Sequence, residues 1–520
     1  MSAWNRHWYG SVAALRPYLL RKGILILLAF DTWVLMVRHA GRYGAGGFNV
    51  AHFGWLDALH PVPTPDWYVG MLTLSAFLAL AMALAGETTV GMLGLFALYT
   101  YSWSMSMLDS YQHHYLLSLM LLCLALFPRI GAEGLLSPLR QSSHAAPGQL
   151  RCTESGPRSI LPRATQAWLY TGVAAAVVVL LLTVGRSSGS WLWLGGGIVV
   201  IVVTAVFCAR SGEVCVLALT GAWAYRLLLT IVAVVYGYAA IAKIDTMWRE
   251  GHTFRSIGDS DRLLEPVARF VAGFGFSEAS FWELAATGVV AGEVALAFGY
   301  ALAVYRDQYD RPWLQACSWA TWVLALGLHV TIELIDLSIG WFSYYMSWAA
   351  CVCLLPVRWL HVLTLAITWP ARQALALLGR WDRDESTHKE SPIVGFMLAL
   401  AVAGLALWTG WSIDLPGVFG ATLLVGLGLL VRAAVALHST RQRTLLRRYL
   451  LSTGLSAALL WLAVARGSVR FDYYRFVGSD LRHRGELEAA LEAYVKADRH
   501  APEGKSRRKQ IDKLKRLLAR

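Results

Sequence analysis

Lys243 is the residue of this chain whose chemistry fits least with its surroundings. It is the only lysine between Lys22 and Lys389, and it ends a long apolar run that closes with Tyr-Gly-Tyr-Ala-Ala-Ile-Ala-Lys. Most other positive charges of the chain are arginines. An arginine keeps its proton in a protein, whereas a lysine in an apolar pocket can lose it and act as a base. The alternative is a lysine at a helix end that extends its charge to the membrane interface.

Other ionisable residues interrupt the apolar runs and are candidates to act with Lys243. They are His113, His114, Arg226, Glu293, His329, Glu333 and Asp336. Charged groups in membrane spans are costly and usually face the interior of the bundle. Two structural alternatives stay open, namely a buried ion pair between Glu293 and Arg226 and a core position for His329.

A metal site and a transport pathway are competing interpretations of the same residues. The histidines and carboxylates show no His-x-x-x-His or Glu-x-x-His helical spacing, so we expect no metal. A transporter would place charges at the membrane midplane and is built from internal repeats. No such repeat is evident in the sequence.

The elements that must position these residues are membrane helices. The chain has 520 residues, of which 57% are hydrophobic and 15% charged, whereas soluble proteins have about 25% charged residues. Apolar runs predict spans near 23–37, 67–86, 89–108, 114–128, 167–185, 191–209, 217–241, 281–304, 316–334, 339–356, 393–412, 416–437 and 449–465. The predicted fold is an all-α polytopic bundle of about 13 transmembrane helices with a short soluble helical tail.

Basic loops predict the orientation of these spans. The basic stretches near 6–22, 129–163, 358–389 and 441–448 fall on one side if the spans alternate. Positive loops stay in the cytoplasm, so we expect a multi-pass cell-membrane protein with a cytoplasmic N-terminus and an outer C-terminal tail. These loops and the tail account for much of the net charge of +13, so no nucleic-acid partner is expected. The outer side then carries His113, His114, Lys243, Asp245, Glu333 and Asp336, as one outward-facing pocket requires.

Three segments outside the spans have informative patterns. Residues 249–280 are amphipathic and are expected to lie along the outer face, while 359–378 reads as an interfacial helix. Residues 484–502 resemble the second helix of a tetratricopeptide repeat, which we expect to pack on the protein or to bind a partner. Residues 507–516 predict a basic helix that is either solvated or in contact with anionic lipid headgroups.

Three stretches carry a resemblance to a known family. The first runs from Trp55-Leu-Asp-Ala-Leu-His through Asp66-Trp-Tyr and continues at Leu108-Asp-Ser-Tyr-Gln-His-His. The second is Tyr236-Gly-Tyr-Ala-Ala-Ile-Ala-Lys-Ile-Asp-Thr-Met-Trp-Arg-Glu-Gly251. A looser third match combines His329 with Ser338-Ile-Gly-Trp-Phe-Ser-Tyr-Tyr-Met. These stretches, spread over roughly residues 15–356, resemble the vitamin K-dependent γ-glutamyl carboxylases and their bacterial relatives with a horizontally transferred transmembrane domain.

The resemblance implies a specific chemistry. In that family a lysine deprotonates a reduced vitamin K or related quinol, oxygen converts the quinol to a strong base, and this base removes the γ-proton of a glutamate in a peptide or protein. Carbon dioxide then adds to the carbanion. By resemblance Lys243 is the base, and His113 or His114 stabilises the carbanion or delivers a proton. The resemblance also implies an apolar quinol pocket, and we expect its lining to include Tyr236, Trp248, Glu293 and His329.

The chain departs from the family in two regions. A helix pair near 167–209 is inserted before the Lys243 span, and the family's large extracytoplasmic substrate region is replaced by further spans and the basic tail. We therefore predict a carboxylase-like segment 1–356, a segment 357–465 with an interfacial helix and three more spans, and a tail 466–520. Two functions stay open: a quinol-dependent carboxylase-like enzyme, and a non-catalytic membrane protein that binds a quinone or lipid or assembles partners through its tail. The lipid bilayer is a partner in both.

Overall fold

The structure, a computed structural model, is mostly helical and includes parts of each predicted region except the inserted helix pair. It describes Asn5 and residues 8–33, 65–104, 112–127, 219–256, 260–306, 311–334, 341–357, 359–360, 392–437, 440–464, 467–502 and 504–519. The predicted helix pair 167–209 lies outside the described residues, as does nearly all of the predicted interfacial helix 359–378.

The chain divides into two compact units. The first comprises Met1–Leu20 and Phe127–Lys389, and the second comprises Arg21–Leu126 and Glu390–Arg520. Each unit joins segments that are far apart in the sequence, because helices pack by surface complementarity and not by chain order. The predicted segments 1–356, 357–465 and 466–520 follow the chain instead, and they stay predictions.

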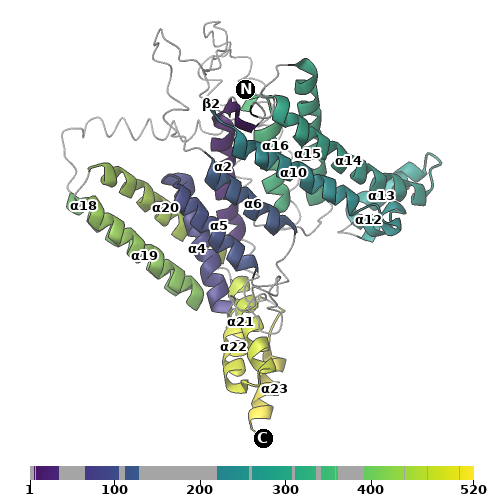
Figure 1. Cartoon of the computed structure of the whole chain (residues 1–520). Coiled ribbons are helices and arrows are strands. Elements are labelled where there is room, and N and C mark those ends of the chain that lie inside the picture. The colour runs from purple at the N-terminus through teal and green to yellow at the C-terminus, as the bar shows by residue number, and fades with distance from the viewer. Residues whose placement is uncertain are drawn as a thin grey trace, which may run out of the picture. The chain divides into compact units, whose positions relative to one another are not determined.

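The first unit is a helical group with one small sheet. Strand β1 (Ser11–Ala13) pairs antiparallel with β2 (Leu219–Gly221), so the predicted all-α fold carries two short strands in addition. The helices are α10 (Trp223–Ile241), α11 (Thr246–Arg249), α12 (His252–Ser256), α13 (Ser260–Ala272), α14 (Glu278–Arg306), α15 (Pro312–Leu334) and α16 (Phe342–Leu354). Helix α14 packs against both α10 and α15, and α15 packs against α16 (Figure 1).

The connection from α10 to α14 contains the short helices α11, α12 and α13 and includes most of the amphipathic segment 249–280. The predicted position of that segment along the outer face stays a prediction. Asp245 begins α11 because its side chain accepts a 2.9 Å hydrogen bond from the backbone N–H of Trp248. Gly251 follows with a φ of +76°, and a β-carbon there would lie 2.6 Å from backbone and side-chain atoms of Trp282. Only glycine fits this turn without strain, and the turn brings α11 and α12 onto α14.

The second unit combines N-terminal helices with the helices of the C-terminal third of the chain. Its elements are the end of α2 (Leu15–Asp31), which begins in the first unit, with α4 (Pro65–Leu84), α5 (Thr89–Ser104), α6 (Gln112–Leu126), α18 (Pro392–Ile413), α19 (Pro416–Ala436), α20 (Thr440–Val464), α21 (Gly467–His483), α22 (Leu487–Arg499) and α23 (Arg508–Leu518). Helices α18, α19 and α20 pack on one another, and α4 packs on α5, α19 and α20 (Figure 1).

Glycines allow α4 and α19 to approach closely. A β-carbon on Gly70 would lie 3.0 Å from the backbone oxygen of Gly417, so a larger residue would separate the two helices. Small residues at such crossings are typical of membrane helices, where packing and not water exclusion drives association. The preceding turn between α18 and α19 contains Asp414, the one described non-glycine residue with positive φ, at 56°.

Five helices of the described residues are long and apolar enough to cross a membrane. They are Asp66–Leu84, Trp223–Ile241, Glu278–Arg306, Ile393–Ile413 and Pro416–Ala436. Each coincides within a few residues with a predicted span. The helices therefore support a membrane location for an all-α protein, while the predicted total of about 13 spans and the orientation stay predictions.

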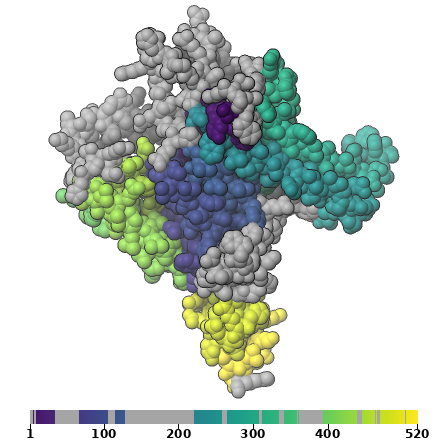
Figure 2. Space-filling view, viewed as in Figure 1, coloured from purple at the N-terminus to yellow at the C-terminus, as the bar shows by residue number. Residues whose placement is uncertain are grey.

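The tail forms three packed helices, α21, α22 and α23, which Figure 2 shows in yellow as one continuous lobe. Helix α22 lies within the residues predicted as the second helix of a tetratricopeptide repeat, and α23 confirms the predicted basic helix. Gly478 of α21 leaves room for the Tyr494 ring of α22, which would lie 3.1 Å from a β-carbon at that glycine.

Hydrogen bonds hold the tail against the transmembrane helices of its unit. The hydroxyl of Tyr473 donates to the Asp66 carboxylate at the start of α4, and the hydroxyl of Tyr474 donates to the backbone oxygen of Asp414. These contacts belong to α21, so the tail packs on the protein through this helix, while partner binding by residues 484–502 stays a prediction. At the turn before α23, Asp498 accepts hydrogen bonds from the Arg507 backbone N–H and from Ser506, and these lower the pKa of its carboxyl.

Candidate functional site

Lys243 lies in the turn directly after α10, where its ammonium group contacts the end of that helix and an aromatic ring. Its Nζ donates a 3.2 Å hydrogen bond to the backbone oxygen of Ala239, in the last turn of α10. A positive charge is favourable there because the C-terminal carbonyl groups of a helix carry partial negative charge. The same Nζ lies 5.4 Å from the centre of the Trp248 ring, within the range of a cation–π interaction.

Glu293 of α14 is the ionic partner of Lys243. The Nζ atom lies 2.7 Å from Oε1 and 2.9 Å from Oε2, so both carboxylate oxygens accept from the amine. The Glu293 side chain is 10% exposed and the Lys243 side chain 23% exposed. The pair is therefore largely enclosed by protein, with one open side on the lysine. The buried ion pair expected for Glu293 exists, and the residue that forms it is Lys243.

Trp248 joins the ion pair to an aromatic cluster around the start of α14. Its Nε1 donates a 3.3 Å hydrogen bond to the backbone oxygen of Ala286, and its ring contacts Phe254, which in turn contacts Trp282 edge-on. Trp248 is 7% exposed. The sequence predicted Trp248 as a pocket residue, and the structure places it beside Lys243 and Glu293.

Tyr236 and His329 form a second polar pair in the same unit. The Tyr236 hydroxyl and His329 Nε2 share a 2.7 Å hydrogen bond, and Tyr236 stacks on Tyr300 of α14 with ring centres 5.7 Å apart. All three side chains are buried. Within the described residues, His329 Nδ1 and the Tyr300 hydroxyl have no hydrogen-bond partner. Unsatisfied buried polar atoms are rare in native proteins, and an ordered water, an ion or a catalytic role can account for them.

One register between α10 and α14 produces both the Lys243–Glu293 ion pair and the Tyr236–Tyr300 ring contact. Tyr236 precedes Lys243 by seven residues on the α10 side, and Tyr300 follows Glu293 by seven residues on α14. The two helices run antiparallel, so one register brings Lys243 to Glu293 and Tyr236 to Tyr300. Seven residues are two helical turns, so the two polar layers lie about 10 Å apart along one seam. Leu296 and Ala240, both buried, occupy the positions between the layers.

No protein-family model, curated protein or solved structure matches the chain. The resemblance to the vitamin K-dependent carboxylases therefore rests on the motifs in the sequence.

The predicted histidines belong to the second unit. His114 lies in the first turns of α6, where its Nδ1 shares a 2.8 Å hydrogen bond with the Tyr99 hydroxyl and its ring stacks on Trp103. The side chain of His113 lies outside the described residues. The predicted cooperation of either histidine with Lys243 joins residues of two separate units and stays a prediction.

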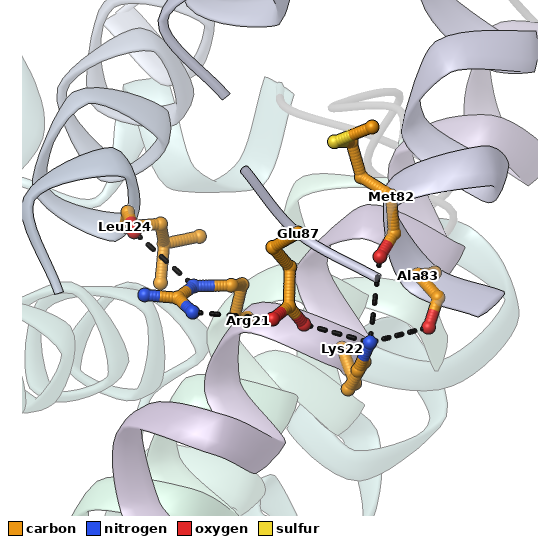
Figure 3. Close-up of polar contacts among 6 residues, drawn as sticks. All are labelled: Arg21, Lys22, Met82, Ala83, Glu87 and Leu124. Carbon is orange, nitrogen blue, oxygen red and sulfur yellow. Dashed lines mark hydrogen bonds and ion pairs between the residues drawn. The ribbon is translucent and has the colours of Figure 1, made fainter. Parts of the chain in front are cut away.

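A second lysine–glutamate pair in that unit has a structural explanation (Figure 3). Glu87 lies 2.7 Å from the Nζ of Lys22 and 3.3 Å from a guanidinium nitrogen of Arg21. Lys22 also donates a 2.5 Å hydrogen bond to the backbone oxygen of Ala83 at the end of α4, and Arg21 donates to Leu124 at the end of α6. These cations cap two helix C-termini, and Glu87 offsets their charge.

Two buried arginines of the first unit cap α16 in the same way. Arg16 donates to the backbone oxygens of Val352 and Leu355 at 2.5 and 2.8 Å, and Arg306 donates to that of Leu354 at 2.5 Å. The arginines are 0% and 2% exposed. Sequence analysis assigned Arg16 only to a basic, topology-determining stretch and gave Arg306 no role. Neither position carries a local signal for its distant carbonyl partners.

The described residues contain no group of three or more His, Cys, Asp or Glu side chains that could hold a metal ion. Asp245 serves as a helix cap, and Asp336 lies outside the described residues. The arrangement around Lys243 can exchange a proton between an amine and a carboxylate beside an aromatic surface. The Tyr236–His329 layer can offer hydrogen bonds to an oxygen-bearing ring.

Proposed function

We propose that this membrane protein is a quinol-dependent, carboxylase-like enzyme in which Lys243 is the base. The observation that supports this most directly is the Lys243–Glu293 pair, because it joins a proton donor and a proton acceptor in a largely buried position. The lysine is also the one that the motif shared with the γ-glutamyl carboxylases singles out. The proposed reaction uses a reduced quinone, oxygen and carbon dioxide to carboxylate a glutamate in a peptide or protein.

The proposed first step is a proton transfer within the ion pair. A quinol that covers the open side of Lys243 would exclude water from the ammonium group. In a dry environment two charges are less favourable than two neutral groups, so the proton would pass from Nζ to the Glu293 carboxylate. The neutral amine would then accept the hydroxyl proton of the quinol. Trp248 supplies an aromatic face beside the amine, 5.4 Å from Nζ.

The layer of Tyr236, Tyr300 and His329 is the proposed contact for the rest of the quinol ring. Its unsatisfied His329 Nδ1 and Tyr300 hydroxyl are suited to a quinone oxygen, and its stacked rings are suited to an apolar ring. His113 or His114 is proposed to act near the glutamate carbanion. We further propose a cytoplasmic N-terminus and an outward-facing site in the cell membrane, in line with the basic loops.

Carbon dioxide incorporation tests the proposal. Purified protein in detergent would receive reduced vitamin K, oxygen, labelled bicarbonate and a short glutamate peptide, beside the variants Lys243→Arg and Glu293→Gln. Arginine can keep the ion pair but cannot become a base. The expected result is labelled peptide, or quinone epoxide without labelled peptide, that disappears in Lys243→Arg. Product formation that survives Lys243→Arg would refute the assignment of the base.

A non-catalytic function is the second candidate, and the tail favours it. The tail consists of three packed helices, and residues 484–502 among them resemble one helix of a tetratricopeptide repeat. Under this alternative the tail assembles a partner while the bundle binds a quinone or lipid. Under this alternative neither product forms, although the protein binds the quinone. Quinone binding measured on the same preparation separates this outcome from a misfolded protein.

A further inference from the structure

Two arginines of the tail face one buried aromatic ring. Phe471 of α21 is 1% exposed. The guanidinium carbon of Arg475 lies 5.5 Å from the centre of its ring, and that of Arg507 lies 5.3 Å away. Arg475 is one helical turn after Phe471, whereas Arg507 comes from the turn before α23. The fold of the tail thus brings two like charges that are distant in sequence to the same ring.

These guanidinium groups have more donors than the tail has acceptors for them. Arg475 forms one ion pair, with Asp472 at 3.1 Å. Arg507 forms no ion pair with any described residue, and the Nε atoms of both arginines are buried without a hydrogen-bond partner in the described part of the chain. A buried N–H that gives up water without gaining an acceptor costs free energy. An oxyanion that accepts hydrogen bonds from these guanidinium groups would offset that cost.

The electrostatics of Arg475 and Arg507 also favour a bound anion. Burial lowers the pKa of Arg507, and the charge of Arg475 lowers it further. The two arginines repel each other, and the charge of Asp472 offsets this repulsion only in part. A further negative group would attract both guanidinium groups. Arginine forks match carboxylate and phosphate oxygens with two parallel hydrogen bonds.

We propose that Arg475 and Arg507, held against Phe471, form an oxyanion site that binds carboxylate side chains of an acidic polypeptide. The site lies outside the Lys243 region and requires no quinol, so it does not depend on the proposed enzymatic function.

The neighbouring helix favours a polypeptide over a single small anion or a lipid headgroup. Lys509, Lys513 and Arg516 repeat at four and three residues along α23, so they share one face, and all three are exposed. Such a row adds exposed positive charge on the helix that follows Arg507 and suits a partner with several acidic residues. Figure 1 shows α23 and the C-terminus at the end of the tail away from α4 and α19, which places this row away from those apolar helices of its unit.

Binding of a glutamate-rich peptide to the full-length protein tests the site. The protein would be held in nanodiscs of zwitterionic lipid, and the probe would be a labelled ten-residue polyglutamate peptide, with the glutamine peptide as a blank. Arg475→Gln combined with Arg507→Gln is expected to weaken binding by about tenfold or more, as loss of charge-assisted hydrogen bonds predicts. Millimolar inorganic phosphate is expected to compete with the peptide.

The matched control is Arg499→Gln combined with Lys505→Gln, which removes two exposed charges from the same tail. Its expected effect is less than twofold, since screened surface charges contribute little. Equal weakening by both double variants, or a peptide that phosphate does not displace, would overturn the proposed site. Hydrogen exchange of α22 verifies that each variant tail is folded. If hydrogen exchange around residues 470–476 slows with anionic lipid but not with the peptide, the site binds lipid headgroups, and the proposed polypeptide partner is overturned.

Discussion

Replacement of Glu293 by glutamine tests whether the Lys243 pair is the coupled unit that the geometry describes. Glutamine keeps the size of the side chain but removes the charge that accepts two contacts of 2.7 and 2.9 Å. Removing one partner of a fully buried pair costs about 3–5 kcal/mol. Lys243 retains Ala239, the Trp248 ring and 23% exposure of its side chain. We therefore expect Glu293→Gln to lower the free energy of unfolding by about 2–3 kcal/mol.

A double-mutant cycle isolates the interaction energy. Lys243→Met should cost a similar amount because it leaves the Glu293 carboxylate buried without its cation. The double variant should cost less than the sum of the two single variants by about 2 kcal/mol, since the second change removes a charge that the first left unpaired. Unfolding of the purified protein in mixed micelles, followed by tryptophan fluorescence, gives the three free energies. Costs that simply add, within about 0.5 kcal/mol, would refute the coupled pair.

The Lys22–Glu87 pair provides the matched control for function. Its separation of 2.7 Å equals that of the Lys243 pair, and its Glu87 side chain is 8% exposed. Glu87 also lies 3.3 Å from Arg21, so Glu87→Gln should lower stability by at least a comparable amount. If the Lys243 pair has a chemical role, only variants at Lys243 and Glu293 should abolish quinol oxidation in preparations of equal folded content. If variants of both pairs lose activity in proportion to their loss of stability, the Lys243 pair has a structural role alone.

Three further predictions concern the backbone, the second polar layer and the tail. Gly251→Ala should lower the unfolding free energy by about 2 kcal/mol or more, whereas Gly275→Ala, also at positive φ but with nothing within 4 Å, should cost only the backbone strain. Tyr236→Phe should cost about 1–3 kcal/mol, because His329 Nε2 loses its partner; thermal unfolding measures it, and an unchanged midpoint would contradict the hydrogen bond. The lowered pKa of Asp498 stabilises the folded tail above about pH 4, and this contribution is lost as pH falls further. Hydrogen exchange of the tail amides should become faster below this pH. In Asp498→Asn this pH dependence should be absent.

The positions of the apolar helices followed from hydrophobic length. The spans predicted at 393–412 and 416–437 correspond to α18 (Pro392–Ile413) and α19 (Pro416–Ala436), because prolines and Asp414 interrupt the apolar runs there. The span predicted at 449–465 corresponds to a longer helix, α20, which begins at Thr440. No proline or glycine separates its arginine-rich start from its apolar part, so the helix continues through the charges. Hydrophobicity defines the membrane-facing part of a helix and not its end.

Partners across helices could not be predicted from local patterns. Glu293 was considered with Arg226 as one alternative, yet the structure pairs it with Lys243. The caps of α16 by Arg16 and Arg306 depend on carbonyl groups far away in sequence. Such contacts are determined by how helices dock, and residue type alone specifies only that a buried cation needs an acceptor.

The register of α10 and α14 nevertheless left a signal in the sequence. Polar or aromatic residues recur at a seven-residue interval on both helices, as Tyr236 and Lys243 on one and Glu293 and Tyr300 on the other. When two antiparallel helices carry such residues at the same interval, a single register places each residue opposite one on the other helix. A single lysine in an apolar run could be an interfacial residue, but a lysine and a tyrosine that match a glutamate and a tyrosine at the same interval specify a helix pairing. The two layers are thus consequences of one pairing, and a variant that shifts α10 against α14 would disrupt both while leaving the composition of the seam unchanged.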